Sequence, residues 1–227
     1  MRHGQRGAAF ARGGEPGSIR LCGGAEFDAV WSIINAAATA YDGVIPADRY
    51  HVPYMPVDEL RREIGAGVRF WGWHETAPAA SSARPGPAGG GWAPAGDRLV
   101  GVMGIQDVDD VTLIRHAYVE PTRQGTGVGG ALLAHLLALA SPDRPLLVGT
   151  WAAASWAVRF YERHGFALVT PDEKDRLLRR YWNIADRQVE TSVVLRLREE
   201  PRDTASDAAT DERMGRGTGP DTEPCTR

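Results

Sequence analysis

One segment, residues 118–133, constrains this chain more than any other. It reads YVEPTRQGTGVGGALL, which indicates a strand, a proline break, a glycine loop and the start of an apolar-faced helix. The glycines leave no side chain between backbone N–H groups and an approaching ligand; they are Gly125, Gly127, Gly129 and Gly130. The helix would add unpaired N–H groups and the positive end of its dipole. The segment therefore predicts an anion site of the phosphate-binding kind.

Two other interpretations of these glycines have to be weighed. Gly125, Gly127 and Gly130 also satisfy G-x-G-x-x-G, which would indicate a dinucleotide fold and a nucleotide-cofactor oxidoreductase. In that fold the first glycine follows the strand directly, whereas residues 120–124 intervene here. The acid at about the right distance, Asp143, precedes the next expected strand instead of ending it. No Gly-Lys-Ser/Thr follows, which excludes a P-loop. A purely structural turn remains the third interpretation.

A second segment decides between these interpretations. Residues 153–166 read AASWAVRFYERHGF, which indicates a short helix that ends in a glycine before another strand. Together the two segments resemble the GNAT N-acetyltransferase superfamily. Its pyrophosphate loop, Gln/Arg-x-x-Gly-x-Gly/Ala, is matched by residues 124–129, and its later Phe-Tyr and Gly-Phe signature by residues 160–166. Both motifs occur in the family's order and spacing, and the resemblance covers about residues 18–198.

Length and composition agree with one catalytic domain. The chain has 227 residues, 43% of them hydrophobic, which is enough for one sizeable core. Its net charge of −3 argues against a nucleic-acid partner or an anionic membrane surface. No segment is apolar enough for a membrane helix or a signal peptide, so a cytoplasmic location is expected. The two cysteines and six histidines have no zinc-like spacing, so we expect no metal; a homodimer is compatible with the sequence.

Three segments have compositions too polar or too small-residue-rich to offset the entropy of ordering them, about 1–2 kcal/mol per residue. They are an N-terminal segment (1–17), an Ala/Pro/Gly/Ser-rich insertion (77–96) and a C-terminal tail (199–227). We expect all three to be disordered around a domain spanning residues 18–198, with the insertion as an enlarged hairpin loop.

The remaining pattern alternates strands and helices. Strands are expected at about residues 18–21, 68–74, 98–105, 111–119, 146–150, 166–169 and 189–197. Helices are expected at about residues 26–41 and 58–64, after the glycine loop, and in the second motif. The resemblance implies an α/β (α+β) fold: a mixed, mostly antiparallel twisted sheet flanked by helices, with acetyl-CoA in a cleft between splayed central strands.

Acetyl-CoA is the co-substrate that the resemblance implies. Backbone groups of three strand residues would pair with its pantetheine arm, namely Ala117, Tyr118 and Val119. The loop would bind its pyrophosphate through Gln124, Gly125, Thr126, Gly127, Val128, Gly129 and Gly130. Ser155 would partly replace an asparagine that many relatives carry where this chain has Ala154.

The same resemblance places Tyr161 beside the thioester sulfur, where its hydroxyl could protonate the leaving thiolate; the alternative is a tyrosine that only packs. No general base is assigned, because the strand at residues 146–150 contains no carboxylate; His116 is the foremost nearby group. Residues 41–54, rich in Tyr, His, Asp and Arg, lie where relatives shape their acceptor pocket. We expect a primary amine of a small molecule or amino-acid-like acceptor. An acyl-CoA-binding sensor or partner module on the same scaffold is the non-enzymatic alternative.

Overall fold

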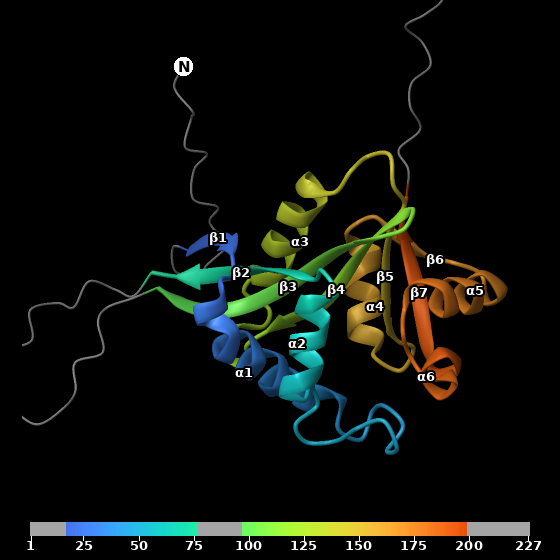
Figure 1. Ribbon diagram of the computed structural model, residues 1–227, viewed down its shortest axis with the longest axis horizontal. Helices are drawn as coiled ribbons and strands as arrows, with labels where there is room; N and C mark the ends of the chain where they lie inside the picture. The colour runs from blue at the N-terminus through green and yellow to red at the C-terminus, as the bar shows by residue number, and fades with distance from the viewer. Residues whose placement is uncertain (1–16, 77–96, 199–227) are drawn as a thin grey trace, which may run out of the picture.

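The computed structural model describes residues 17–76 and 97–198 (Figure 1). The disorder expected for the two ends and for residues 77–96 falls outside the described residues. The expected N-terminal boundary needs one correction, because the first strand already begins at Gly17. Within the described residues, no helix is both long and apolar enough to span a membrane.

A seven-stranded sheet organises the fold, in the order β1-β2-β3-β4-β5-β7-β6. Its strands are β1 (Gly17–Leu21), β2 (Arg69–Glu75), β3 (Arg98–Val108), β4 (Val111–Val119), β5 (Leu146–Trp151), β6 (Phe166–Leu168) and β7 (Ser192–Leu197). Every neighbouring pair is antiparallel except β4 and β5, which are parallel. The expected mixed, mostly antiparallel α/β fold is confirmed.

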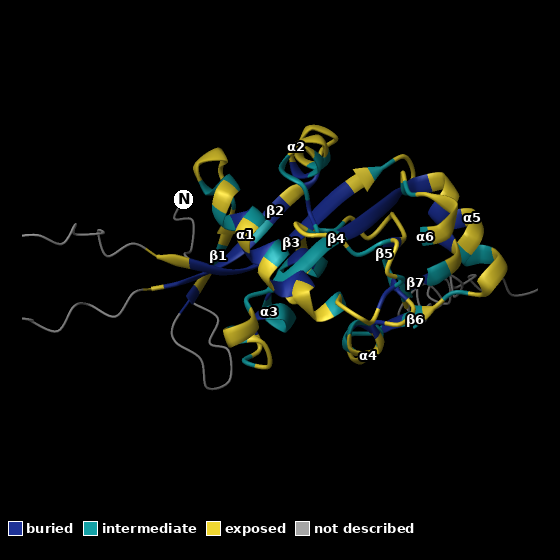
Figure 2. Ribbon diagram, turned by 90° about the horizontal axis from the view of Figure 1, so that it is seen from below, coloured by how far each residue is buried: buried dark blue, intermediate teal, exposed yellow. Residues whose placement is uncertain are grey.

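Helices cover both faces of this sheet (Figures 1 and 2). One face carries α1 (Phe27–Ala38), α2 (Val57–Gly65), α5 (Pro171–Tyr181) and α6 (Asp186–Thr191). The other carries α3 (Val128–Leu139) and α4 (Ser155–Arg163). Short 3₁₀ turns lie at Gly24–Glu26, Thr39–Tyr41 and Pro121–Arg123. Helix α3 is held by Leu132, Leu133 and Leu136, whose helical spacing puts all three in the core, fully buried.

Two elements near the C-terminus differ from expectation. The strand expected at residues 189–197 begins only at Ser192, because Val189 belongs to α6 and packs into the cluster beneath α5. Helix α5 was not expected at all. Its start nevertheless carries local signals: Pro171 occupies the first turn, and the Thr170 hydroxyl accepts a hydrogen bond from the Glu173 N–H at 3.4 Å.

The two central strands separate partway along their length. Strands β4 and β5 pair at only three positions, the last being Ile114 with Val148. Beyond that point β4 continues along β3 as far as Val119, and β5 continues along β7 as far as Trp151. The expected splay between central strands is therefore present, and the edge of β4 that faces β5 has no strand partner there among the described residues.

A bulge in β4 lies at this opening. His116 and Ala117 together stand opposite Met103 of β3, where the register shifts, and His116 has a positive φ of 49°. The bulge turns Arg115 and His116 toward α2, while Ala117 packs into the core cluster that contains α3. Without the extra residue, strand alternation would have placed His116 on the opposite face from Arg115.

Candidate functional site

The glycine loop connects the end of β4 to α3. Gly125 and Gly127 have φ angles of 78° and 95°, a left-handed conformation that glycine adopts at little cost. Gly127 is also the N-cap of α3, so the first N–H groups of this 12-residue helix have no acceptor within it. The backbone thus offers donors and the positive helix end at the same place, as an anion site requires.

The four glycines have different roles. A Cβ on Gly125 would meet nothing within 4 Å, so this position faces open space. A Cβ on Gly129 would lie 3.7 Å from the ring of Phe160, and one on Gly130 would lie 3.2 Å from the His164 imidazole. These last two positions point at α4 and allow α3 to pack against it. Any contact they make with an anion would come from their N–H groups.

Three other loop residues predicted to bind the cofactor are already engaged within the protein. The Gln124 amide donates to the Val119 carbonyl at 3.1 Å, and the Thr126 hydroxyl donates to the Arg123 carbonyl at 2.7 Å. The Val128 side chain is 3% exposed and belongs to the core. Gln124 and Thr126 therefore hold the shape of the loop, and Val128 can present only its backbone.

The predicted strand residues divide between the two faces of the sheet. Ala117 and Val119 pack against the core cluster under α3, whereas the Tyr118 side chain lies among the residues under α1. Ser155 is the first residue of α4 and is exposed, and Ala154 before it is fully buried.

Tyr161 lies on α4 in the core cluster that also contains Val148 of β5. Its side chain is 4% exposed, and its ring meets Phe160 and Phe166 edge-on, with centroids 5.1 and 5.6 Å away. Burial raises the pKa of the Tyr161 hydroxyl above its usual value, so the group stays protonated near neutral pH. A neutral hydroxyl suits a proton donor, and the aromatic contacts equally suit a packing role.

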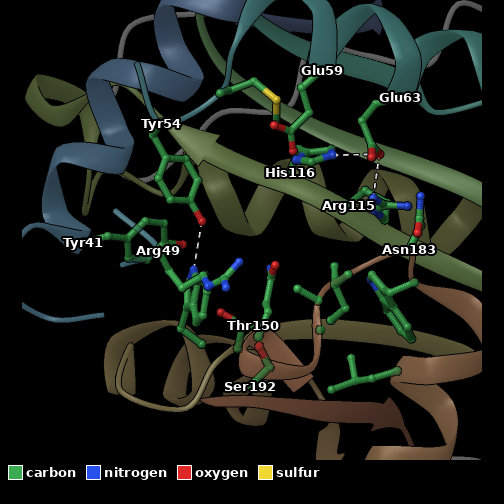
Figure 3. A pocket seen from close by; sticks show the side chains of 18 of the residues that line it. Tyr41, Arg49, Tyr54, Glu59, Glu63, Arg115, His116, Thr150, Asn183 and Ser192 are labelled. Atoms are coloured by element: carbon green, nitrogen blue, oxygen red, sulfur yellow. Dashed lines mark hydrogen bonds and ion pairs between the residues drawn. The ribbon is translucent and has the colours of Figure 1, made fainter. Parts of the chain in front are cut away.

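A cavity of about 370 Å³ lies on the face of the sheet opposite to α3 and α4, over the opening between β4 and β5 (Figure 3). Its walls come from α2, β4, β5, β7 and the connection from α5 to α6, which contribute among others Glu63, His116, Thr150, Ser192 and Asn183. The segment 41–54, expected to shape an acceptor pocket, contributes Tyr41, Asp48, Arg49, His51 and Tyr54.

Three tyrosines form one wall of this cavity. The rings of Tyr41 and Tyr54 lie 5.3 Å apart, and that of Tyr118 meets Tyr41 edge-on at 6.4 Å. The Tyr54 hydroxyl accepts a hydrogen bond of 2.8 Å from the Trp151 indole, which ties this wall to β5. Burial raises the pKa of both Tyr41 and Tyr118, so this wall is neutral and polar.

Glu63, His116 and Arg115 form the facing wall. Glu63 Oε2 lies 3.1 Å from His116 Nε2 and 2.5 Å from Arg115 Nη2. Burial alone would raise the pKa of Glu63, but hydrogen bonds and charge from His116 and Arg115 outweigh it and lower that pKa. An ionised Glu63 can only accept, so His116 Nε2 must carry the hydrogen. In the neutral imidazole the lone pair is then on Nδ1.

This arrangement was only partly visible in the sequence. His116 was singled out as the foremost basic group, but Glu63 was not, because nothing distinguishes it from a solvated helix acid. Asp107 and Asp110, which are close to His116 in the sequence, lie elsewhere: Asp107 accepts from the Thr112 hydroxyl at 2.7 Å, and Asp110 accepts from the Tyr181 hydroxyl at 2.6 Å. Neither contributes to the cavity wall.

Comparison with known proteins agrees with this architecture. Residues 89–168 match the family model of the acetyltransferase (GNAT) domain. Similar solved structures include a GNAT-family acetyltransferase from Staphylococcus aureus Mu50, at 12% identity over 80% of this chain and 99% of that one, TM-score 0.55. Another is the PaiA N-acetyltransferase from Thermoplasma acidophilum in complex with coenzyme A, at 11% identity, 81% and 99% coverage, TM-score 0.51. A third is histone acetyltransferase HPA2 and related acetyltransferase from Corynebacterium glutamicum ATCC 13032, at 14% identity, 81% and 97% coverage, TM-score 0.53. No curated protein matches the chain.

Proposed function

We propose that this chain, whose residues 89–168 match the acetyltransferase (GNAT) domain model, is a GNAT-family, acetyl-CoA-dependent N-acetyltransferase that acts on the primary amine of a small acceptor. One observation carries the proposal. The glycine loop leads into a helix on one face of the sheet, the polar cavity lies on the other face, and β4 and β5 stop pairing between the two. An acyl donor and an amine can therefore meet between the two strands.

The residues present fit acetyl-CoA. Gly125 and Gly127 give the loop its left-handed turns, and the first N–H groups of α3 would receive the pyrophosphate. The β4 edge at residues 117–119 has no pairing with β5 and would accept the pantetheine arm in the way a sheet accepts another strand. When bound, acetyl-CoA supplies the acetyl group as an activated thioester.

The amine must lose its proton before it can attack. An amine of pKa about 10.4 is neutral in about one molecule in 2,500 at pH 7, a deficit of about 4.6 kcal/mol. His116 Nδ1 would take this proton, and the Glu63 carboxylate on Nε2 would stabilise the imidazolium that results. The amine nitrogen forms the new N–C bond as the C–S bond breaks. The Tyr161 hydroxyl would give a proton to the departing sulfur.

The cavity volume also favours a small acceptor. About 370 Å³ is near the lower end of the range for small-molecule sites, about 300–1,000 Å³. Hydroxyl, carboxylate and imidazole groups line it, and such groups orient a polar ligand by hydrogen bonds.

Release of free CoA thiol from acetyl-CoA, measured with a panel of small primary amines, tests this proposal. We expect at least one amine to give turnover well above the rate of acetyl-CoA hydrolysis, with an N-acetyl product identified by mass spectrometry. Stabilisation by acetyl-CoA without turnover on any amine would favour the sensor or partner module. Stabilisation by NAD but not by acetyl-CoA would favour the oxidoreductase instead.

A further inference from the structure

The cavity contains two arginines that differ in their hydrogen bonds. Arg115 is fully engaged: Nη1 donates to Gln106 at 2.8 Å, and Nη2 lies 2.5 Å from Glu63. Arg49 has a single ion contact among the described residues, 3.4 Å from its Nε to Asp48. Its Nε is buried and makes no hydrogen bond to any described residue. Arg49 therefore has fewer protein partners than Arg115, and its Nε–H would gain from an acceptor that a ligand brings.

Arg49 is also well placed. Its backbone N–H closes a turn on the Pro46 carbonyl at 2.8 Å, which fixes the start of the side chain. Figure 3 shows Arg49 entering the cavity beside Tyr41 and Tyr54, across from the wall that holds Glu63 and His116. One end of the cavity therefore presents the Arg49 guanidinium beside Asp48. The other end presents His116 as a proton acceptor, held by Glu63, which also pairs with Arg115.

We propose that the acceptor is an amino carboxylate, whose carboxylate binds Arg49 while its amine lies at His116. This inference rests on the proposed function and names its substrate class. The planar guanidinium presents paired N–H donors that match the two oxygens of a carboxylate. An amine without a carboxylate would bring its positive charge toward Arg49 and leave Asp48 as the one ion contact of the guanidinium among the described residues. A zwitterion satisfies both ends of the cavity.

Matched acceptors with and without a carboxylate test the inference. We would compare L-phenylalanine with 2-phenylethylamine, and γ-aminobutyrate with propylamine, in the thiol-release assay. Loss of a charge-assisted pair is expected to lower kcat/KM for the amino carboxylates about 10- to 100-fold in Arg49→Gln, mainly through KM. The rate with the matched amines should not fall. Arg49→Lys should keep part of the preference, because it retains the charge but not the paired donors.

Arg187→Gln is the matched control. Arg187 also approaches Asp48, at 3.9 Å, but its side chain is 51% exposed and does not line the cavity. Arg187→Gln therefore removes one positive charge near Asp48, as Arg49→Gln does, but it changes no residue that lines the cavity. We expect it to leave the carboxylate preference unchanged, and thermal melting should report both variants as folded.

Saturation-transfer NMR on the same compounds separates this inference from the proposed function. Binding of an amino carboxylate that is lost in Arg49→Gln and kept in Arg187→Gln supports the carboxylate site even if no amine is acetylated. In that case only the proposed acetyltransferase activity would be wrong. Equal turnover of both members of each pair, or a carboxylate preference that survives Arg49→Gln, overturns the inference and leaves N-acetyl transfer standing. No saturation transfer from the wild-type protein to either amino carboxylate also overturns it.

Discussion

Glu63 and His116 are 53 residues apart in the chain, yet Oε2 of the first lies 3.1 Å from Nε2 of the second. The contact depends on two local features. The bulge in β4 turns His116 toward α2, and helical spacing puts Glu63 on the side of α2 that faces the sheet. A carboxylate on Nε2 selects the imidazole tautomer with its lone pair on Nδ1, which is the form that can take a proton from an ammonium group.

His116→Gln should lower kcat with the best amine about 10²-fold or more, because general-base catalysis commonly contributes that much. Glu63→Gln should cause a smaller loss, since it removes the stabilisation of the imidazolium but keeps the imidazole. Acetyl-CoA affinity should stay within a few-fold in both variants. Steady-state kinetics over pH 6–10 checks the assignment: the loss should shrink as pH rises and the amine deprotonates by itself. A loss that is the same at every pH would speak against the base.

Two glycine variants should separate loop shape from helix packing. Gly129→Ala places its methyl group in ordinary contact with Phe160 and replaces a helical glycine, so we expect about 0.5–1 kcal/mol of added stability and unchanged acetyl-CoA binding. Gly127→Ala forces an alanine into a left-handed N-cap at φ 95°, at a cost of about 1–2 kcal/mol. It should also weaken acetyl-CoA binding.

Thermal shifts measured against acetyl-CoA concentration check both outcomes. The wild-type protein should be stabilised by about 2.7 kcal/mol at a ligand concentration of 100 Kd. A wild-type shift retained in full by Gly127→Ala would contradict the role given to the loop.

Much of the scaffold could be predicted because its signals are local. The glycine loop, the Tyr161 helix and most strands were recognisable from short motifs and from apolar periodicity. Helix α5 was missed although Thr170 and Pro171 mark its start, since few large apolar residues mark its buried face. Val189 was assigned to a strand because its β-branched neighbours suggested one, and its contact with α5 is tertiary.

The site was less predictable, because its central contacts are long-range. Segment 41–54 was expected at the acceptor pocket through the resemblance alone. No sequence pattern shows that Arg115 is bound by Gln106 and Glu63 while Arg49 contacts only Asp48 among the described residues. The positive φ of His116 cannot be read from a strand-like sequence either. Such features depend on which elements the sheet brings together.

Acid should destabilise the protein in part through Glu26. Burial opposes ionisation of this carboxylate, but hydrogen bonds from Arg20, the Gly23 N–H and His74 lower its pKa to about 2. A carboxylate whose pKa is lower when folded stabilises the protein above its unfolded pKa of about 4.5, and this contribution is lost as pH falls from 4.5 toward 2. Glu26→Gln should therefore lose stability at pH 7 and approach the wild type in acid.

At pH 7 we expect the free energy of unfolding of Glu26→Gln to be about 1–2 kcal/mol below that of the wild type. The full pKa change would give ~3 kcal/mol, but solvent screens the charge of this partly exposed carboxylate. Urea unfolding at several pH values between 7 and 3 measures it. Asp58→Asn, which breaks an exposed pair between Asp58 and Arg61, is the control variant. A constant offset for Glu26→Gln across this range would contradict the linkage.

Tyr161→Phe distinguishes a proton donor from a packing residue. The phenyl ring keeps the contacts with Phe160 and Phe166, so the protein should remain folded and its Kd for acetyl-CoA should change by no more than a few-fold. If the hydroxyl protonates the leaving thiolate, kcat should fall about 10- to 1,000-fold. The lower part of that range is expected, since a thiolate with a pKa near 8.5 can leave unprotonated. A more acidic leaving thiol in place of CoA should shrink the defect, because it needs the proton less. Full turnover by Tyr161→Phe with acetyl-CoA and the best amine would assign this tyrosine to packing alone.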